Sequence, residues 1–341
     1  MLLQAGARQR VAVIVNENAR GVRGRVIDDL QELVPPHDLY LSRSLDHSRQ
    51  IAARVVERAY DTILLGGGDG TFVQCLSDVA AESRRRGQAL PSVGVLRLGT
   101  GNALADCLGA SRPTANGLAH DLGRARRASR PRELSLLEVD GKLTPFAGCG
   151  LDAQILEDLG IVSKVVDKVV GPFAGAIGAA PRYAMTVGLR STPRFMLKQL
   201  PMIEVVNTGK PVYPIDWKTG RVLEEDAIAK GQIVWRGRAS IASCSTIPNF
   251  GLGMKMFPFC DARDGRFQLR TATATAYETI RNLPAVFRGE YRSPQLHDYL
   301  CTSVEIRMER PVPVQIGGDL QDGSRSRLRI AMGTTPVHVY A

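Results

Sequence analysis

The sequence predicts an α/β domain with a doubly wound parallel sheet, followed by a second domain built mostly from antiparallel strands. Two observations predict the first domain. Strand-like and helix-like segments alternate strictly through the first 110 residues, and the strand-like segments are short, solid apolar runs typical of strands buried on both faces. A third observation predicts the second domain: beyond residue 130, strand-like runs follow one another between turn signals.

The first half of the alternation runs from residue 11 to residue 65. We expect strands at 11–16, 39–42 and 62–65, because each is a compact apolar run. Between the first two, apolar residues recur at helical spacing over 22–33. The helix before the third strand is expected to begin with Asp46 as its N-cap.

The second half of the alternation continues with a helix over 72–83 and a strand over 92–98. Another helix begins near residue 103, with Gly109 as its stop. The polar, Arg-rich stretch 124–133 then breaks the rhythm and is predicted to be a linker.

The second domain opens with a predicted hairpin whose turn is Asp140-Gly141. The domain bounds expected are 1–129 for the α/β domain and 130–321 for the β-rich domain, with a tail of about 322–341 packing back onto the first. Strands are predicted at 233–247, 266–273, 303–308, 312–316 and 327–332, and helices around 153–170 and 277–288.

Composition narrows the class of protein. The chain has 341 residues, 44% of them hydrophobic, which suits a folded protein of two domains. Its formal net charge of +10 favours anionic partners such as nucleotides, nucleic acid or an anionic membrane surface, although charge for solubility is an equal alternative. Aromatic residues are sparse and no nucleic-acid motif accompanies the Arg clusters, so nucleic acid is not expected.

Cysteine usage and hydropathy predict a cytoplasmic protein. The six cysteines form no CxxC pair and no metal-type spacing, which indicates buried free thiols in a reducing compartment. The start of the sequence lacks the apolar core of a signal peptide, and no run of about 20 apolar residues predicts a membrane span.

A glycine-rich turn, "GGGDGT" at 66–71, follows the third predicted strand. Ligands of parallel sheets bind beyond the carboxyl ends of the strands, and glycine lets the backbone approach a ligand closely. The next helix points its positive N-terminus at the same place. We therefore expect a phosphate site here, with a ligand-free tight turn as the alternative. The pattern is neither a P-loop nor a dinucleotide fingerprint.

Asp69 lies inside this turn, where a carboxylate repels phosphate unless it has a role of its own. It is predicted to organise Mg²⁺ or to take a proton from an attacking hydroxyl, with helix capping as the alternative. A second loop, "LGTGNALA" at 98–105, follows the next strand and brings two glycines, Thr100 and Asn102, which is also suited to cap the helix. Two such loops on neighbouring strands predict one crevice.

Together, "GGGDGT" and "LGTGNALA" resemble the diacylglycerol kinase catalytic domain family, which includes sphingosine, ceramide and bacterial lipid kinases and shares its nucleotide fold with NAD kinases and phosphofructokinases. Later segments are also similar to the family. They are "AGCGLDAQILED" (147–158), "GMKMFPFCDARDGRFQL" (253–269) and "VPVQIGGD" (312–319).

The resemblance implies ATP in a crevice between the domains and a lipid alcohol as acceptor, with Asp69 as base or metal organiser and Asp319 as its helper. It implies Mg²⁺ at Asp69 and, in a structural role, at Asp264. Nucleotide contacts are implied for Asn16, Ser42, Gly66, Gly67, Gly68, Gly70, Thr71, Gly99, Thr100, Gly101 and Asn102.

Several residues depart from the family pattern. Glu17 replaces a proline and brings negative charge near the nucleotide, Ala103 replaces an aspartate, and Gly317 stands first in a Gly-Gly-Asp where the family has Asp-Gly-Glu. The position used for a sphingoid amine falls on Gln154, with Glu157 and Asp158 nearby. Asp152 is expected to order a turn or to face the acceptor.

The sequence therefore predicts an ATP-dependent lipid kinase associated peripherally with an anionic membrane. The apolar segment 165–180 is either core or the lipid entrance. A kinase of a soluble alcohol and a non-catalytic binder are the alternatives, and a monomer and a homodimer are both left open.

Overall fold

The computed structural model describes residues 9–19, 21–22, 24–99, 101–127, 131–150, 153–154, 156, 158, 200–274, 278 and 281–340. The chain divides into two compact units. Unit 1 comprises 1–136, 141–143 and 333–341, and unit 2 comprises 137–140 and 144–332.

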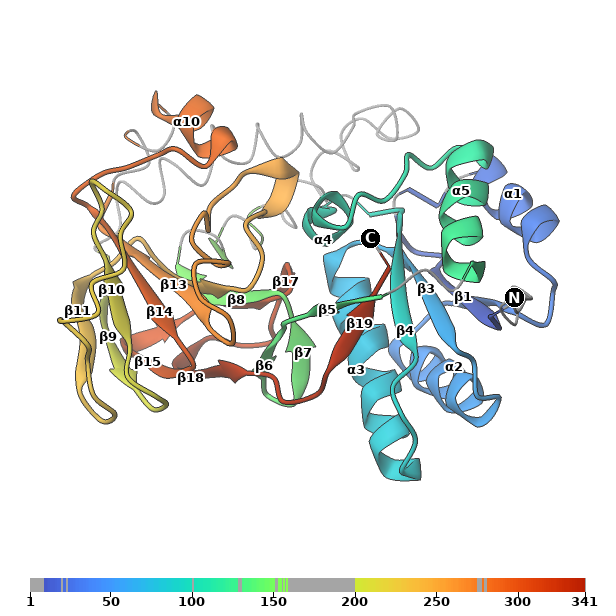
Figure 1. Cartoon of the computed structure of the whole chain (residues 1–341), viewed down its shortest axis with the longest axis horizontal. Helices are drawn as coiled ribbons and strands as arrows, with labels where there is room; N and C mark the ends of the chain where they lie inside the picture. Colours follow the sequence, from blue (N-terminus) through green and yellow to red (C-terminus); the bar gives the residue numbers. More distant parts are fainter. Residues whose placement is uncertain are drawn as a thin grey trace, which may run out of the picture. The chain divides into compact units, whose positions relative to one another are not determined.

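Unit 1 is built on a six-stranded sheet, sheet A, with the strand order β2-β1-β3-β4-β19-β5 (Figure 1). Its first four strands are all parallel, as the alternation of strand and helix predicts. The fold class predicted from the sequence is thereby confirmed for this unit. The strand bounds are β1 Val11–Asn16, β2 Leu39–Ser42, β3 Thr62–Gly67, β4 Ser92–Arg97, β5 Arg132–Leu134 and β19 Val337–Val339.

The helices of unit 1 follow the strands in turn. The helix after β2 is capped by the hydroxyl of Ser44, which accepts the N–H of His47, so the prediction of Asp46 as the cap is wrong by two residues. The predicted linker at 124–133 is also wrong in part, because Arg124 and Arg126 are the last turn of a helix. The helices are α1 Arg25–Leu33, α2 Leu45–Glu57, α3 Asp69–Arg86, α4 Ala103–Cys107 and α5 Ala115–Arg126.

One face of sheet A packs against α1 and α5. Alternate residues of β1, together with Leu64 of β3 and Leu96 of β4, form a core cluster with Leu30 of α1 and Leu118 and Leu122 of α5. Burial of apolar side chains on both faces of the sheet explains why its strands are solid apolar runs and do not alternate with polar residues.

The end of the chain completes sheet A. β19 lies parallel to β4, with Val339 paired to Val93, and antiparallel to β5. The expected tail of 322–341 is divided between the units: residues 333–341 belong to unit 1, whereas most of the preceding residues form β18 of unit 2.

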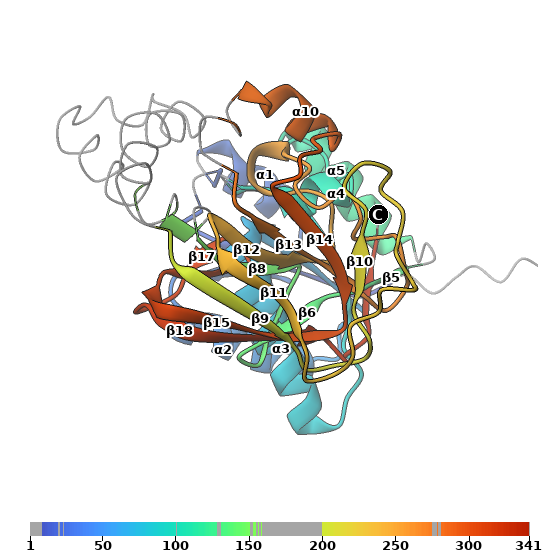
Figure 2. The same ribbon diagram turned by 90° about the vertical axis from the view of Figure 1, so that its left-hand side faces the viewer.

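Unit 2 is built from two antiparallel sheets, as predicted (Figure 2). Sheet C has the order β10-β14-β13-β12-β8-β16-β17, and sheet B has the order β11-β9-β15-β18-β6-β7, whose last strand lies mostly in unit 1. The predicted turn at Asp140-Gly141 joins β6 to β7, with positive φ at both residues. The remaining strands and short helices are β6 Leu137–Val139, β7 Lys142–Thr144, β8 Phe146–Gly150, β9 Met202–Asn207, β10 Tyr213–Ile215, β11 Ile233–Arg238, β12 Ile241–Ser245, η3 Gly251–Gly253, β13 Phe267–Ala272, α10 Leu283–Arg288, β14 Leu296–Cys301, β15 Ser303–Val312, β16 Val314–Ile316, β17 Asp319–Leu320 and β18 Arg325–Met332.

A buried ion pair joins two strands of sheet C. Arg270 of β13 and Asp298 of β14 are cross-strand partners, exposed by only 2% and 4%. The guanidinium donates from Nε to Oδ1 at 2.7 Å and from Nη2 to Oδ2 at 2.8 Å. Gln268 donates a further bond to the same carboxylate. Two charges are tolerated here because this geometry satisfies them together.

The cysteines are all free, as expected, and five of the six are buried. Burial raises the pKa of the Cys75 thiol to about 11, so this thiol is protonated at neutral pH. Among the described residues, no helix has the length and apolar character needed to cross a membrane.

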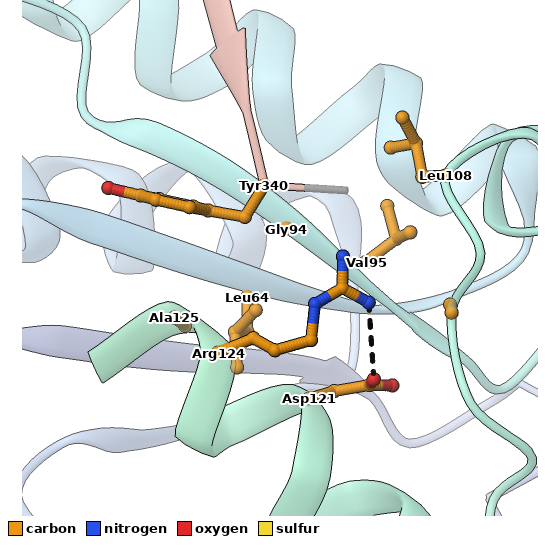
Figure 3. Close-up of a pocket in the computed structure, with 9 residues that line it drawn as sticks. Leu64, Gly94, Val95, Leu108, Asp121, Arg124, Ala125 and Tyr340 are labelled. Carbon is orange, nitrogen blue, oxygen red and sulfur yellow. Dashed lines mark ion pairs between the residues drawn. The ribbon is translucent and has the colours of Figure 1, made fainter. Parts of the chain in front are cut away.

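A small cavity lies inside unit 1 between the middle of β4 and α5 (Figure 3). Its volume of about 10 Å³ matches a single water molecule and is far too small for a nucleotide. The residues around it are Leu64, Gly94, Val95, Leu108, Ala110, Asp121, Arg124, Ala125 and Tyr340.

Replacing Asp298 with alanine is expected to destabilise unit 2 by about 3–5 kcal/mol, because the Arg270 guanidinium is left buried without its partner. Urea denaturation followed by tryptophan fluorescence measures this, since Trp217 and Trp235 both lie in unit 2.

The matched control is Asp46→Ala, which removes the partner of Arg49 in an exposed ion pair and should change stability by less than about 0.5 kcal/mol. A loss below about 1 kcal/mol for Asp298→Ala would contradict the assignment of a buried, mutually dependent pair.

Candidate active site

The two predicted loops leave the carboxyl edge of sheet A, where β1, β3 and β4 end as neighbours. Asn16 ends β1, Gly67 ends β3 and Arg97 ends β4. Gly67 and Arg97 are register partners in the parallel pair. This is the edge at which open parallel sheets bind ligands, and β1 lies between β2 and β3, where the strand order reverses.

The turn between β3 and α3 is shorter than the six residues of "GGGDGT". Gly66 and Gly67 still belong to β3, and Gly68 is the N-cap of α3 with φ −94° and ψ −176°. That conformation is open to any residue. At Gly67 the need for glycine is one of space. A Cβ on Gly67 would lie 2.5 Å from the side chain of Thr71, which folds back over the end of the strand.

A side-chain hydrogen bond connects this turn to the neighbouring strand. Asn16 Nδ2 donates to Thr71 Oγ1 at 3.0 Å, and Asn16 Oδ1 accepts the N–H of Asn18. The end of β1 is thereby fastened to the first turn of α3, which fixes two of the predicted nucleotide residues relative to each other.

The second loop packs directly against the first. A Cβ on Gly99 would lie 2.1 Å from the Cα of Gly68, so only glycine allows the two backbones to meet. Within the loop, Asn102 Nδ2 donates to the Gly99 carbonyl at 2.8 Å and Asn102 Oδ1 accepts the Gly99 N–H at 3.1 Å. Asn102 is at the N-cap position of α4, but its side chain does not cap the helix, contrary to the sequence prediction.

Asp69 provides the cap that Asn102 does not. Its Oδ2 accepts the N–H of Ala103 at 3.1 Å and its Oδ1 accepts the N–H of Leu104 at 3.0 Å. The side chain leaves the first turn of α3 and binds the first turn of α4, and the residue is only 8% exposed. A carboxylate is favourable here because it meets the positive end of a helix. Asp69 therefore holds the two loops together.

The first turn of α3 offers backbone donors beside this junction. The first N–H groups of a helix have no carbonyl partner within it, and no side chain caps this 18-residue helix. Gly70 and Thr71 are partly exposed. This arrangement suits an anionic group such as a phosphate.

Glu17 does not bring an unbalanced charge to this edge. Its carboxylate accepts Arg43 Nε at 2.6 Å and Nη2 at 3.3 Å. Arg43 follows β2, and hydrogen bonding to Glu17 raises the pKa of its guanidinium. Ser42, the last residue of β2, is buried and directs its hydroxyl to the Ser44 carbonyl at 3.4 Å, so its nucleotide contact stays a prediction.

The predicted site residues of unit 2 lie in or beside turns of sheet C. Gly317 and Gly318 form the two-residue turn between β16 and β17 with φ of 59° and 82°, a pair of positive values that favours glycine. Asp319 follows this turn and is exposed. Asp264 is an exposed residue of the turn before β13, ahead of Gly265 with φ 67°.

Four predictions lie outside the described residues: Thr100, Asp152, Glu157 and the segment 165–180. Nucleotide or lipid contacts from these positions remain sequence predictions.

Metal ligands are sparse in the part of the chain that the structure describes, where no group of three acidic, His or Cys side chains could hold a metal ion. Asp264 belongs to no such group in that part, and a metal there stays a prediction. The single carboxylate at the loop junction fits Mg²⁺ carried mainly by nucleotide phosphates, which is the usual manner for this ion in kinases.

Arg97 is a residue of this edge that the sequence analysis did not single out. Its Nη2 forms an ion pair with Oδ1 of Asp106 on α4, and its side chain is 34% exposed. The signal available in the sequence was a lone arginine at the end of a buried apolar strand, directly before a glycine loop.

A protein-family model matches the first part of the chain. Residues 10–131 match the family model of the diacylglycerol kinase catalytic domain. Over these residues the chain is similar to the diacylglycerol kinase catalytic domain. The resemblance of "GGGDGT" and "LGTGNALA" to this family is thereby confirmed, and both loops lie within the matched segment.

Three solved structures from Bacillus anthracis str. Sterne share the fold of the whole chain, each covering 98% of this chain and 97% of the other. Two are provisionally named diacylglycerol kinases and match with a TM-score of 0.63 at 16% and 15% identity. A third, named a diacylglycerol kinase, matches with a TM-score of 0.58 at 14% identity. No curated protein gives a significant match.

Replacing Asp69 with alanine is expected to free the start of α4, because the amides of Ala103 and Leu104 lose their acceptor. Hydrogen bonds to charged groups contribute about 1.5–3 kcal/mol each, so hydrogen exchange at these two amides should accelerate on the order of 10- to 100-fold.

Asp28→Ala is the control, since Asp28 is an exposed acidic residue in the first turn of α1. Unchanged exchange at residues 103 and 104 in the Asp69 variant would show that Asp69 does not hold the loops together.

Replacing Gly99 with alanine is expected to push the two loops apart, because a methyl group would meet the backbone of Gly68. Overpacking of this kind costs about 1–3 kcal/mol, and hydrogen exchange should accelerate in both loops. Gly251→Ala is the matched control, since a Cβ there meets nothing within 4 Å. An equal response of the two variants would contradict the close contact.

Proposed function

We propose that this protein is an ATP-dependent kinase that transfers the γ-phosphate to a hydroxyl group of a lipid alcohol. The family of residues 10–131 supports a kinase of the diacylglycerol kinase type. The lipid, ATP and Mg²⁺ are part of the proposal.

The observation that carries the proposal is the contact between the two glycine loops. Asp69 binds the start of α4 from the start of α3, so two helix beginnings are fixed side by side at the sheet edge. The backbone N–H groups of the α3 turn then face one place without needing to reorganise when charge develops. A triphosphate is the ligand class that such a junction suits best.

Catalysis in this proposal depends mainly on positioning and electrostatics, as expected for phosphoryl transfer. The first-turn amides of α3 hold the phosphates and stabilise the charge of the transferring group. Asp69 fixes the first turn of α4 against that of α3, and its carboxylate would help to hold Mg²⁺. Bound Mg²⁺ would supply neutralisation of the phosphate oxygens. Asp319 of unit 2 is proposed to accept the proton of the acceptor hydroxyl.

The acceptor is proposed to be a lipid at an anionic membrane surface. The net charge of +10 supports attraction to such a surface. Peripheral association with it in the cytoplasm is part of the proposal. Nucleic acid is not part of it. A soluble alcohol acceptor and a non-catalytic nucleotide binder remain the alternatives, and a homodimer remains open.

The experiment is incubation of the full chain with γ-labelled ATP, Mg²⁺ and a total lipid extract, followed by chromatography of the labelled product. A labelled lipid is the expected result. Asp69→Ala should lower the rate at least about 100-fold, because the electrostatic site is no longer organised. Asp28→Ala should leave the rate unchanged.

Two outcomes would redirect the proposal. Label appearing only in a soluble product, together with no sedimentation on vesicles containing anionic lipid, would favour a soluble acceptor. Thermal stabilisation by ATP without any labelled product from the lipid extract would favour a non-catalytic binder.

A further inference from the structure

We propose that Arg97 binds the β- or γ-phosphate of the nucleotide and exchanges its ion pair with Asp106 for this contact when the nucleotide enters. The inference rests on the proposed function and adds a residue to the same site.

The position of Arg97 follows from the register of sheet A. Arg97 pairs with Gly67, and paired residues of neighbouring parallel strands lie about 5 Å apart with their side chains on the same face. A Cβ on Gly67 would point into the side chain of Thr71. Arg97 therefore rises from the sheet on the face covered by the first turn of α3, next to the turn whose amides are the proposed phosphate donors.

Helix α4 also fixes the position of the Arg97 side chain. Asp106 lies two to three residues after Ala103 and Leu104, whose amides bind Asp69 of α3. The guanidinium of Arg97 forms an ion pair with the carboxylate of Asp106 on this helix. Arg97 is thus held beside the junction of the two loops by an ion pair within unit 1, with one third of its side chain and about one fifth of that of Asp106 exposed.

The chemistry of this side chain suits a phosphate. A guanidinium has five N–H donors in a planar fork, and a single carboxylate cannot satisfy all of them. Bidentate binding to phosphate oxygens is the geometry for which arginine is specialised. Asp69 also places a negative charge at the loop junction, so a cation beside it would lower the repulsion of an entering polyphosphate.

Arg43, at the same sheet edge, is differently placed. It uses both Nε and Nη2 on Glu17 in a fork-to-fork pair, so its donors toward a second anion are fewer. Arg97 pairs with Asp106 through Nη2. A partly exposed pair of this kind is weak enough to be exchanged for a stronger partner.

The plainer interpretation is that Arg97 and Asp106 only fasten α4 to β4. The two interpretations differ in what the loss of Asp106 does. A purely structural ion pair needs both Arg97 and Asp106, so replacing either residue would harm the site equally. A phosphate ligand needs only Arg97, and removing Asp106 would release it for the nucleotide.

The test is isothermal titration of the full chain with ATP and, separately, with AMP, in the presence of Mg²⁺. Arg97→Gln is expected to weaken ATP binding on the order of 10- to 100-fold, because charge-assisted bonds to phosphate are lost. AMP lacks the β- and γ-phosphates, and its affinity should change by less than about threefold. Asp106→Asn should leave ATP affinity unchanged or raise it.

Two further variants keep the test decisive. Arg97→Lys keeps a single cation and should lose less ATP affinity than Arg97→Gln, which gives a result even if the glutamine variant folds poorly. Arg49→Gln is the control, because Arg49 lies on α2 in an exposed pair with Asp46. Its affinity for ATP should equal that of the unchanged chain.

Three results would overturn the inference. Equal losses of ATP and AMP affinity in Arg97→Gln, or matching losses in Arg97→Gln and Asp106→Asn, would show a structural fastening. Full ATP affinity in Arg97→Gln would exclude a phosphate contact while leaving the proposed function intact. No binding of ATP to the unchanged chain would instead overturn the proposed function, and the role of Arg97 with it.

Discussion

The site depends on one interaction: the carboxylate of Asp69, at the start of α3, accepts the first two amide N–H groups of α4. The N-terminus of each helix carries partial positive charge, and bringing two N-termini together is unfavourable without an anion between them. Asp69 supplies that anion from within the chain. Because it is nearly buried, its bonds are stronger than they would be in water and the loops share one fixed geometry.

The same reasoning explains two residues that differ from the family pattern. Glu17 would be an obstacle to a polyphosphate at this edge, but Arg43 binds its carboxylate through both Nε and Nη2. Ala103 carries no carboxylate of its own, and its backbone N–H instead donates to the carboxylate of Asp69. Charge at the sheet edge is therefore balanced by pairs of residues. The identity of one motif residue does not by itself predict the electrostatic potential there.

The fold was largely predictable because periodicity reports burial directly: solid apolar runs gave the parallel strands, and Asp140-Gly141 gave its hairpin. What remained beyond prediction was set by contacts distant in sequence. Nothing local shows that Asp69 caps α4 and Asn102 does not, that Gly99 is required by the backbone of Gly68, or that Arg97 meets Asp106. The last turn of α5 was missed because its arginine-rich sequence has the composition of a linker.

The insertion of β19 between β4 and β5 makes the first unit discontinuous along the chain. During synthesis, the six-stranded sheet stays incomplete until about 200 residues beyond β5 have been translated, and β4 and β5 meanwhile have unpaired edges. Completion of sheet A is therefore coupled to the synthesis of everything encoded between β5 and β19.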